Sequence, residues 1–173
     1  NGQGFNNIAN PTITFEDCIF DGNTQHIIAA VDAASRVRRC LFTSTTSTTT
    51  PPLSGSLTYD YCVFDHRTQA TGQEIFRAEG AGKVINLNNC LVLGSTGGSS
   101  ILRSLSSGVA NVTNTILRRG RIWGQGTSFN LDYCNESSAG ADLGTITRTN
   151  TVSGDPLLDE DDFTIGTGSP CID

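Results

Sequence analysis

The sequence predicts a single all-β domain that forms a solenoid, in which short parallel strands stack turn upon turn. The first observation is a short phrase that recurs along the 173-residue chain. The second is the composition, because 19 glycines and many Thr, Ser and Asn residues favour strands and turns. The third is that no stretch of about 12 residues has helical periodicity. Internal repeats of this size are typical of a solenoid.

The repeated phrase consists of two alternating apolar residues, two turn residues, a cysteine or threonine, and one more apolar residue two positions later. Clear copies span residues 13–20, 57–64 and 85–92, and weaker copies are centred on Cys40, Thr115, Cys134 and Thr151. Successive cysteine or threonine positions are 22, 22, 28, 25, 19 and 17 residues apart. The unequal intervals indicate turns of one coil with loops of different length.

Each phrase predicts two strands joined by a corner. Residues two apart in a strand share a face, so Ile13 and Phe15 form one inward pair and Cys18 and Phe20 form another. Residues 16–17 make the bend between them. Asparagine, which tolerates the left-handed backbone of a sharp corner, recurs at the corresponding bends, residues 88–89, 113–114 and 149–150.

A third strand is expected after most phrases. Apolar clusters follow at residues 27–30, 75–76, 101–102 and 122–123. Three short strands per turn, stacked about 4.8 Å apart, predict a parallel β-helix of about seven turns and on the order of 35 Å long.

Stacked turns should form interior ladders of equivalent side chains. The ladders run through residues 13, 35, 57, 85, 110, 129 and 146, through 15, 37, 59, 87, 112, 131 and 148, and through 20, 42, 64, 92, 117, 136 and 153. They are apolar through five turns and polar in the last two, which we interpret as the end of the rod opening to solvent. The residues expected to have a purely structural role, as members of the interior ladders, are Cys18, Cys40, Cys62, Cys90, Thr115, Cys134, Phe20, Phe42 and Phe64.

Five of the six cysteines are therefore interpreted as small buried hydrophobic residues. Thiols on successive turns run parallel and do not converge on a metal, and no C-x-x-C pair occurs, so we expect no metal site. Parallel Cβ vectors also disfavour disulfides between turns. Cys171 lies outside the repeat and is the residue expected to form a disulfide, if any does.

The repeat resembles that of the right-handed parallel β-helix proteins, the pectate-lyase-like group of secreted and surface proteins, over nearly the whole chain. The stretch Asp155-Pro-Leu-Leu, then Asp162-Phe-Thr-Ile, then residues 168–173 is similar to the closing segment of many bacterial members, with Cys171 where alanine is usual. The predicted organisation is an irregular N-terminal contact segment (1–11), a right-handed β-helix (12–154) and a C-terminal closing segment (155–173).

Charge and hydropathy restrict the partners. Acidic residues outnumber basic ones by 17 to 11, for a net charge of -6, which disfavours nucleic acid and anionic lipid. No apolar run reaches the roughly 20 residues of a membrane helix, so no membrane insertion is expected. The chain begins at Asn1, which indicates a processed form or a fragment.

No covering helix is predicted for the open strand edges, so self-association, end to end or as a trimer, is expected.

Asp65-His66-Arg67, just past a strand, is the best local constellation for polysaccharide cleavage. A hydrolase requires two carboxylates and a lyase a base with cations; a carboxylate pair could come from Asp60, Asp65, Glu74 or Glu79. The alternative is that these are solvated loop charges. The Gly-His-Gly and paired aspartates of galacturonan hydrolases are absent, and lysine is nearly absent.

Arg118, Arg119 and Arg121 with Trp123 form the one cluster in which basic and aromatic residues combine. It is a candidate for binding an acidic sugar, with Trp123 stacking on the ring. The alternative is that Trp123 packs inside its turn and the arginines balance neighbouring acids.

These observations predict a non-enzymatic structural or adhesive module, extracellular or on a cell or virion surface, that self-associates and contacts glycans. No cofactor is expected. The alternative is a polysaccharide lyase or glycoside hydrolase, or a fragment of one, acting on an acidic polysaccharide with Asp65, His66 and Arg67 nearest the chemistry.

Overall fold

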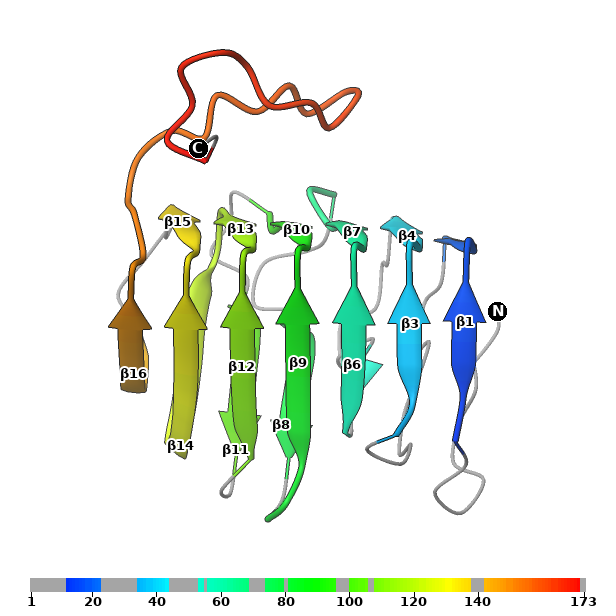
Figure 1. Cartoon of the computed structure of the whole chain (residues 1–173). Helices are drawn as coiled ribbons and strands as arrows, with labels where there is room; N and C mark the ends of the chain where they lie inside the picture. Colours follow the sequence, from blue (N-terminus) through cyan, green and yellow to red (C-terminus); the bar gives the residue numbers. More distant parts are fainter. Residues whose placement is uncertain are drawn as a thin grey trace.

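A computed structural model of the chain describes residues 12–22, 34–43, 53–54, 56–68, 74–79, 81–95, 100–105, 108–137 and 142–171. All regular structure in these residues is strand, which confirms the predicted all-β class. Here sixteen strands wind into a parallel β-solenoid (Figure 1). The predicted N-terminal segment, residues 1–11, lies outside the described residues.

The described strands form three faces of the coil. The first face consists of β1 (Thr14–Glu16), β3 (Arg36–Arg38), β6 (Leu57–Asp60), β9 (Val84–Asn88), β12 (Val109–Thr113), the second half of β14 (Arg121–Asp132) and β16 (Leu143–Thr149). The second consists of β2 (Ile19–Asp21), β4 (Leu41–Thr43), β7 (Val63–Asp65), β10 (Leu91–Leu93), β13 (Ile116–Arg118) and β15 (Asn135–Ser137). The third consists of β5 (Leu53–Ser54), β8 (Glu74–Glu79), β11 (Ser100–Leu105) and the first half of β14.

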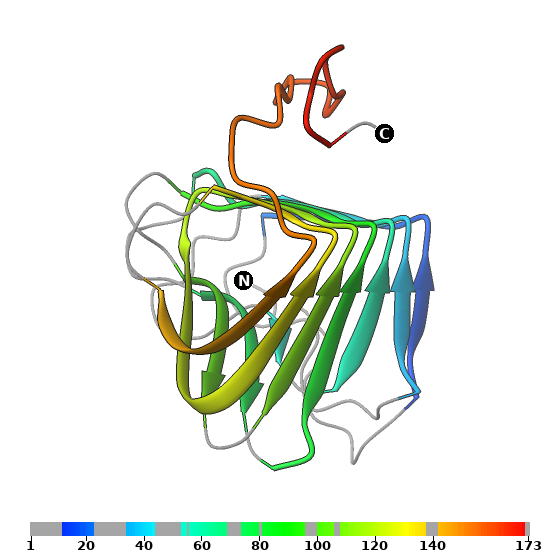
Figure 2. The same cartoon turned by 60° about the vertical axis from the view of Figure 1, so that its left-hand side comes forward.

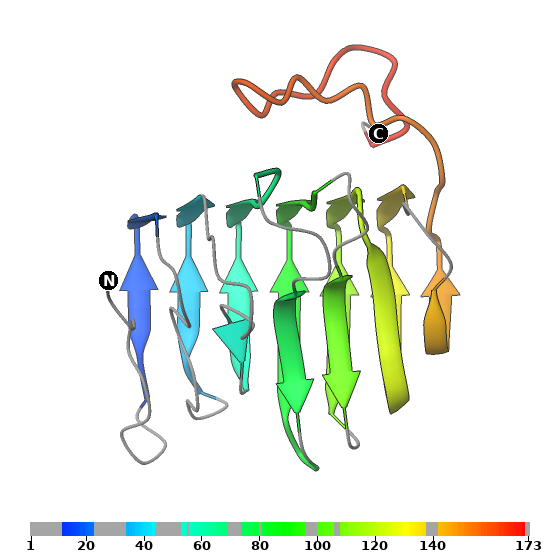
Figure 3. The ribbon, with the colours of Figure 1, turned by 180° about the vertical axis from the view of Figure 1, so that it is seen from behind.

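Neighbouring strands on each face are parallel, as the repeat predicts. In Figure 2 the chain climbs the first face, crosses the second and descends the third while it advances toward the viewer. The coil is therefore right-handed, the hand that the twist of parallel strands favours. Figure 3 shows the third face from behind.

The number of turns depends on the face that is counted. Seven described strands stack on the first face, but only four stack on the third. The structure therefore has about four complete three-stranded turns, fewer than the seven expected. The apolar cluster at residues 27–30, expected to form a further third strand, lies outside the described residues. The cluster at 122–123 belongs to β14, which runs from the third face to the first without interruption.

The corner between the first and second faces is a single residue with left-handed backbone. The φ angle lies between 49° and 57° at all seven positions, which we call the corner row: Asp17, Arg39, Tyr61, Asn89, Asn114, Tyr133 and Asn150. The first six donate their backbone N–H to a carbonyl of the next turn at 3.0–3.1 Å. These bonds hold the corners in register, and they offset the free-energy cost of the left-handed backbone.

The predicted interior ladders form in register. Cα partners link Phe15, Val37, Tyr59, Leu87, Val112, Leu131 and Arg148 in one ladder, and Phe20, Phe42, Phe64, Val92, Leu117 and Glu136 in another. The rings of Phe20, Phe42 and Phe64 stack with centroids 4.7 Å apart in each pair. Phe42 and Phe64 are fully buried, so the ladder is the apolar core of the coil.

An ion pair covers the C-terminal end of this core. The last rungs of the two ladders are Arg148 and Glu136, and Arg148 donates hydrogen bonds of 2.7 and 2.9 Å to the two carboxylate oxygens of Glu136. Arg148 also pairs with Asp142. A paired charge can face water without leaving an unsatisfied group in the core. The prediction that both of the last two turns are polar is thus only partly right. Phe129 and Leu131, in the sixth turn, are buried apolar residues, and the polar rungs Glu136 and Arg148 form a cover over the apolar interior.

The C-terminal segment (residues 155–171) leaves the coil and runs back over its second face (Figure 1). Leu158 and Phe163 pack against an outer apolar row formed by Val63, Leu91 and Ile116, with Leu93 beside it. The second sheet is therefore apolar on both sides where the segment covers it, which is why strands β7 and β10 do not alternate cleanly between apolar and polar residues.

The phenylalanine ladder makes a prediction about stability. Phe42→Ala should lower the free energy of unfolding by about 3–5 kcal/mol, because it removes a fully buried ring and leaves a cavity between two stacked neighbours. Ile19→Ala, at a side chain 73% exposed on the outer surface of the same sheet, should change it by less than about 0.5 kcal/mol. Urea denaturation of both variants measures the difference, and equal losses would contradict the assigned ladder.

Candidate functional site

The structure places Asp65, His66 and Arg67 at the end of β7, with their side chains in different environments. Arg67 donates two hydrogen bonds of 2.8 Å to the two oxygens of Asp65. The His66 side chain is completely buried. The three residues therefore do not present a base and a free cation to one substrate position.

The protonation states follow from these contacts. The hydrogen bond from Arg67 lowers the pKa of Asp65 below its ordinary value, so the carboxyl stays ionised and cannot act as an acid near neutral pH. Burial lowers the pKa of His66 to about 4, so the imidazole is neutral. A general acid or base must reach the substrate, and the buried ring of His66 is in no position to do so.

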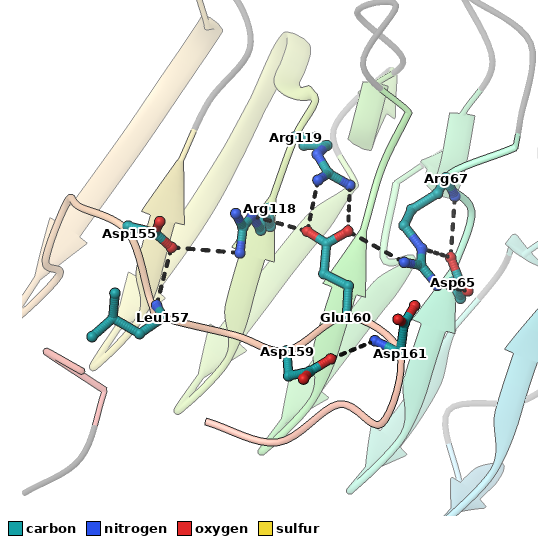
Figure 4. Close-up of polar contacts among 9 residues, drawn as sticks. All are labelled: Asp65, Arg67, Arg118, Arg119, Asp155, Leu157, Asp159, Glu160 and Asp161. Atoms are coloured by element: carbon teal, nitrogen blue, oxygen red, sulfur yellow. Dashed lines mark hydrogen bonds and ion pairs between the residues drawn. The ribbon is translucent and has the colours of Figure 1, made fainter. Parts of the chain in front are cut away.

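Arg118 and Arg119 bind the C-terminal segment, as Figure 4 shows. Arg119 contacts both carboxylate oxygens of Glu160 at 2.7 Å. Arg118 lies 3.2 Å from Glu160 and 3.5 Å from Asp155. Arg67 reaches the same Glu160 carboxylate at 3.3 Å. Glu160 thus joins the two clusters that the sequence analysis considered separately.

Glu160 is largely buried by these contacts, with 16% of its side chain exposed. Three guanidinium groups surround the Glu160 carboxylate. The positive charges of these arginines are therefore mostly neutralised by Glu160, from the C-terminal segment, and by Asp65. The cluster can fix the segment against the second face, beside the apolar contacts of Leu158 and Phe163. Hydrogen-bonded ion pairs of this kind are stronger than neutral hydrogen bonds.

The remaining candidates of the basic cluster lie on β14. The guanidinium carbon of Arg121 is 5.0 Å from the ring centroid of Trp123, within the range of a cation–π contact. Trp123 is half-buried. The Trp123 ring that the sequence analysis assigned to a sugar is thus in contact with a neighbouring arginine.

A groove of about 580 Å³ lies between the corner row and the C-terminal segment. One wall includes five consecutive corner residues, Tyr61, Asn89, Asn114, Tyr133 and Asn150. The other wall comes from the C-terminal segment and includes Phe163, Ile165 and Pro170, and the outer apolar row forms part of the lining. Aromatic, amide and apolar groups combined in a concave surface are typical of a small-molecule or glycan site.

The sequence analysis did not select Tyr61 or Tyr133. Both precede a ladder cysteine by one residue, which is the corner position, and both are exposed, by 58% and 62%. An aromatic residue at a position that must point outward is the signal that could have identified them. The wall opposite could not be found in this way, since it depends on where the C-terminal segment runs.

The ladder cysteines Cys40, Cys62, Cys90 and Cys134 are buried, Cys18 is half-buried, and Thr115 is buried at the equivalent position. Burial raises the pKa of Cys40 to about 11 and raises that of Cys134. The thiols of Cys40 and Cys134 are therefore protonated near neutral pH and are poor nucleophiles. The hydrogen bond with Cys90, by contrast, lowers the pKa of Cys62. Cys171, the residue expected to form a disulfide, has a free thiol and lies at the groove.

No three His, Cys, Asp or Glu side chains among the described residues are placed to hold a metal ion. The described part of the chain also contains no helix of the length and hydropathy needed to cross a membrane. Comparisons with protein-family models, with curated proteins and with solved structures give no match to this chain. The site is therefore interpreted from its own geometry.

The buried histidine predicts a pH dependence of stability. The pKa of His66 is about 4 in the folded chain and about 6.5 in an unfolded one, so the unfolded state binds the proton more tightly. The free energy of unfolding is therefore unaffected by this group above pH 6.5. It falls by roughly 2–3 kcal/mol as the pH drops from 6.5 to about 4, because the unfolded state binds the proton. Urea unfolding across this range should show the slope, and His66→Gln should reduce it. The same slope in the variant would contradict the prediction.

The Glu160 cluster predicts a local effect on the C-terminal segment. Glu160→Gln removes the charge that three arginines share, so opening of residues 155–171 should become easier by about 1–2 kcal/mol. Hydrogen exchange of the segment measures this change as roughly 5- to 30-fold faster exchange. Asp161→Asn, which neutralises an exposed neighbouring carboxylate, is the control. Unchanged exchange in Glu160→Gln would show that the apolar contacts alone hold the segment.

Proposed function

We propose that this chain is a non-enzymatic structural and adhesive β-helix module, extracellular or on a cell or virion surface, that self-associates through its N-terminal end. The observation that supports self-association is the difference between the two ends of the coil. The C-terminal end has a polar, ion-paired rung formed by Arg148 and Glu136. The first rung is apolar: Phe15 and Phe20 are only half-buried, and their rings lie 5.3 Å apart.

The backbone of β1 provides the means of pairing. Among the described strands β1 pairs only with β3. Arg36 N–H donates to Ile13, and Asp17 N–H donates to Arg38. In a parallel ladder alternate residues face the same neighbour, so the N–H and C=O groups of Thr14 and Glu16 point away from β3. Two copies meeting edge to edge about a twofold axis would pair these groups and bury the apolar rungs of both.

The chemistry of the candidate catalytic residues supports a non-enzymatic role over the lyase or hydrolase alternative. Asp65 is held by Arg67, and His66 is buried and neutral. Arg118 and Arg119, which could otherwise neutralise a uronate, contact Glu160. The repeat and the closing segment (155–173) both resemble those of the pectate-lyase-like group of secreted and surface proteins. This resemblance supports the proposed extracellular or surface location.

Light scattering combined with size exclusion tests the association. The chain should form dimers or larger assemblies whose population rises with concentration. Thr14→Pro should shift the population to monomer, because proline removes the outward N–H of β1 without touching its bonds to β3. Thr14→Ser keeps the N–H and should associate like the original chain. A monomer at all concentrations, or a Thr14→Pro variant that associates normally, would refute the proposed edge.

A further inference from the structure

We propose that the groove between the corner row and the C-terminal segment is a binding site for a neutral oligosaccharide chain. The inference rests on the adhesive part of the proposed function and names its ligand. It does not depend on self-association, which concerns the N-terminal end of the coil. The site also differs from the arginine and tryptophan cluster that the sequence favoured for an acidic sugar.

Two exposed tyrosines provide stacking surfaces at separate points along the groove. Tyr61 and Tyr133 both belong to the corner row and both line the groove, with exposures of 58% and 62%. They are three turns apart in the stack, through Asn89 and Asn114. At about 4.8 Å per turn their backbones are about 14 Å apart. That spacing lets one short, extended chain of sugar rings contact both tyrosines, each ring packing its apolar face on an aromatic face.

Asparagine amides lie between and beyond the tyrosines. The side chains of Asn89 and Asn114 are exposed on adjacent turns, and Asn150 follows Tyr133 in the row. Asn114 donates to the Asn89 carbonyl oxygen at 3.4 Å, a long bond that a ligand hydroxyl can replace. Each amide offers two donors and one acceptor group. The row therefore presents donors and acceptors at the same regular spacing as its aromatic rings.

A buried acceptor in the lining points independently to a ligand. Asn135 lines the groove and is 3% exposed. Its Nδ2 donates to the Gly154 carbonyl at 3.4 Å, whereas its Oδ1 accepts no hydrogen bond within the structure. A buried acceptor without a donor costs free energy. A ligand hydroxyl that enters the groove would supply that donor.

The lining also indicates the charge of the ligand. None of the described residues that line the groove is Asp, Glu, Lys, Arg or His. Arg67, Arg118 and Arg119 lie in the separate cluster with Glu160. A uronate or sialic acid would bring a carboxylate into a surface with no cation to pair with it, at a desolvation cost that nothing offsets. Flat apolar faces with hydroxyls at their edges fit the lining without that cost.

The test is binding of defined oligosaccharides to the folded chain, measured by isothermal titration calorimetry. The probes are four- to six-residue gluco-, xylo- and manno-oligosaccharides, with oligogalacturonides as the acidic comparison. At least one neutral series should bind, and the acidic series should bind more weakly than the neutral one. Tyr61→Ala and Tyr133→Ala should each weaken the neutral ligand about tenfold, through loss of one stacked ring.

Matched variants separate the site from general effects. Tyr61→Phe keeps the ring and should bind within about twofold of the original chain. Arg39→Ala changes another residue of the corner row that does not line the groove, and it should leave binding unchanged. Circular dichroism confirms that each variant is folded. Asn135→Leu removes the buried acceptor and should weaken binding of the neutral ligand while Arg39→Ala retains it.

Three results would overturn the inference: no neutral oligosaccharide binds, the oligogalacturonides bind better, or the tyrosine variants bind as well as the original chain. A preference of the groove for an extended apolar peptide, lost in Tyr61→Ala and Tyr133→Ala, would also overturn it. Each outcome can be told apart from failure of the proposed self-association. Dimerisation that persists without sugar binding would refute this inference alone, and sugar binding by a strict monomer would refute the dimer alone.

Discussion

The fold depends on one backbone constraint, the stacking of left-handed corners in register. Each turn must place one residue near φ 50° and donate its N–H to the next turn. Once this is satisfied, the strands on both sides of the corner are aligned, and equivalent side chains stack without further adjustment. Loops elsewhere in the turn can then differ in length, which explains how intervals between 17 and 28 residues remain compatible with one coil.

Charge in this protein serves mainly to close surfaces that the coil leaves open. Glu160 joins Arg67, Arg118 and Arg119, and so fixes the C-terminal segment on the apolar outer row of the second face. Arg148 and Glu136 cover the last rung of the core. In both places an ionic contact lies beside an apolar one. Burial of apolar surface has no preferred direction, so the hydrogen-bonded ion pairs are what fix the position of each covering group.

The groove results from the same two features. The corner row supplies exposed aromatic and amide side chains, because a left-handed corner residue points outward and leaves its side chain free to vary. The C-terminal segment supplies the opposite wall. The arginines that a sequence-based search favours are held by this segment, whereas the tyrosines that it overlooked become the most accessible aromatic surfaces of the described corner row. Position within the repeat, and not local charge, is what identifies the exposed aromatic residues that line the groove.

The sequence by itself determined the all-β class, the parallel coil, the corner positions and the register of the interior ladders, because each of these follows from local periodicity that repeats in every turn. It overestimated the number of three-stranded turns, since seven described strands stack on the first face but only four stack on the third. Only the tertiary structure decided that Asp65 and Arg67 pair with each other, that Glu160 joins distant arginines, and that Tyr61 and Tyr133 face a second wall. These contacts join residues that no local periodicity relates, and they arise because the C-terminal segment returns across the coil.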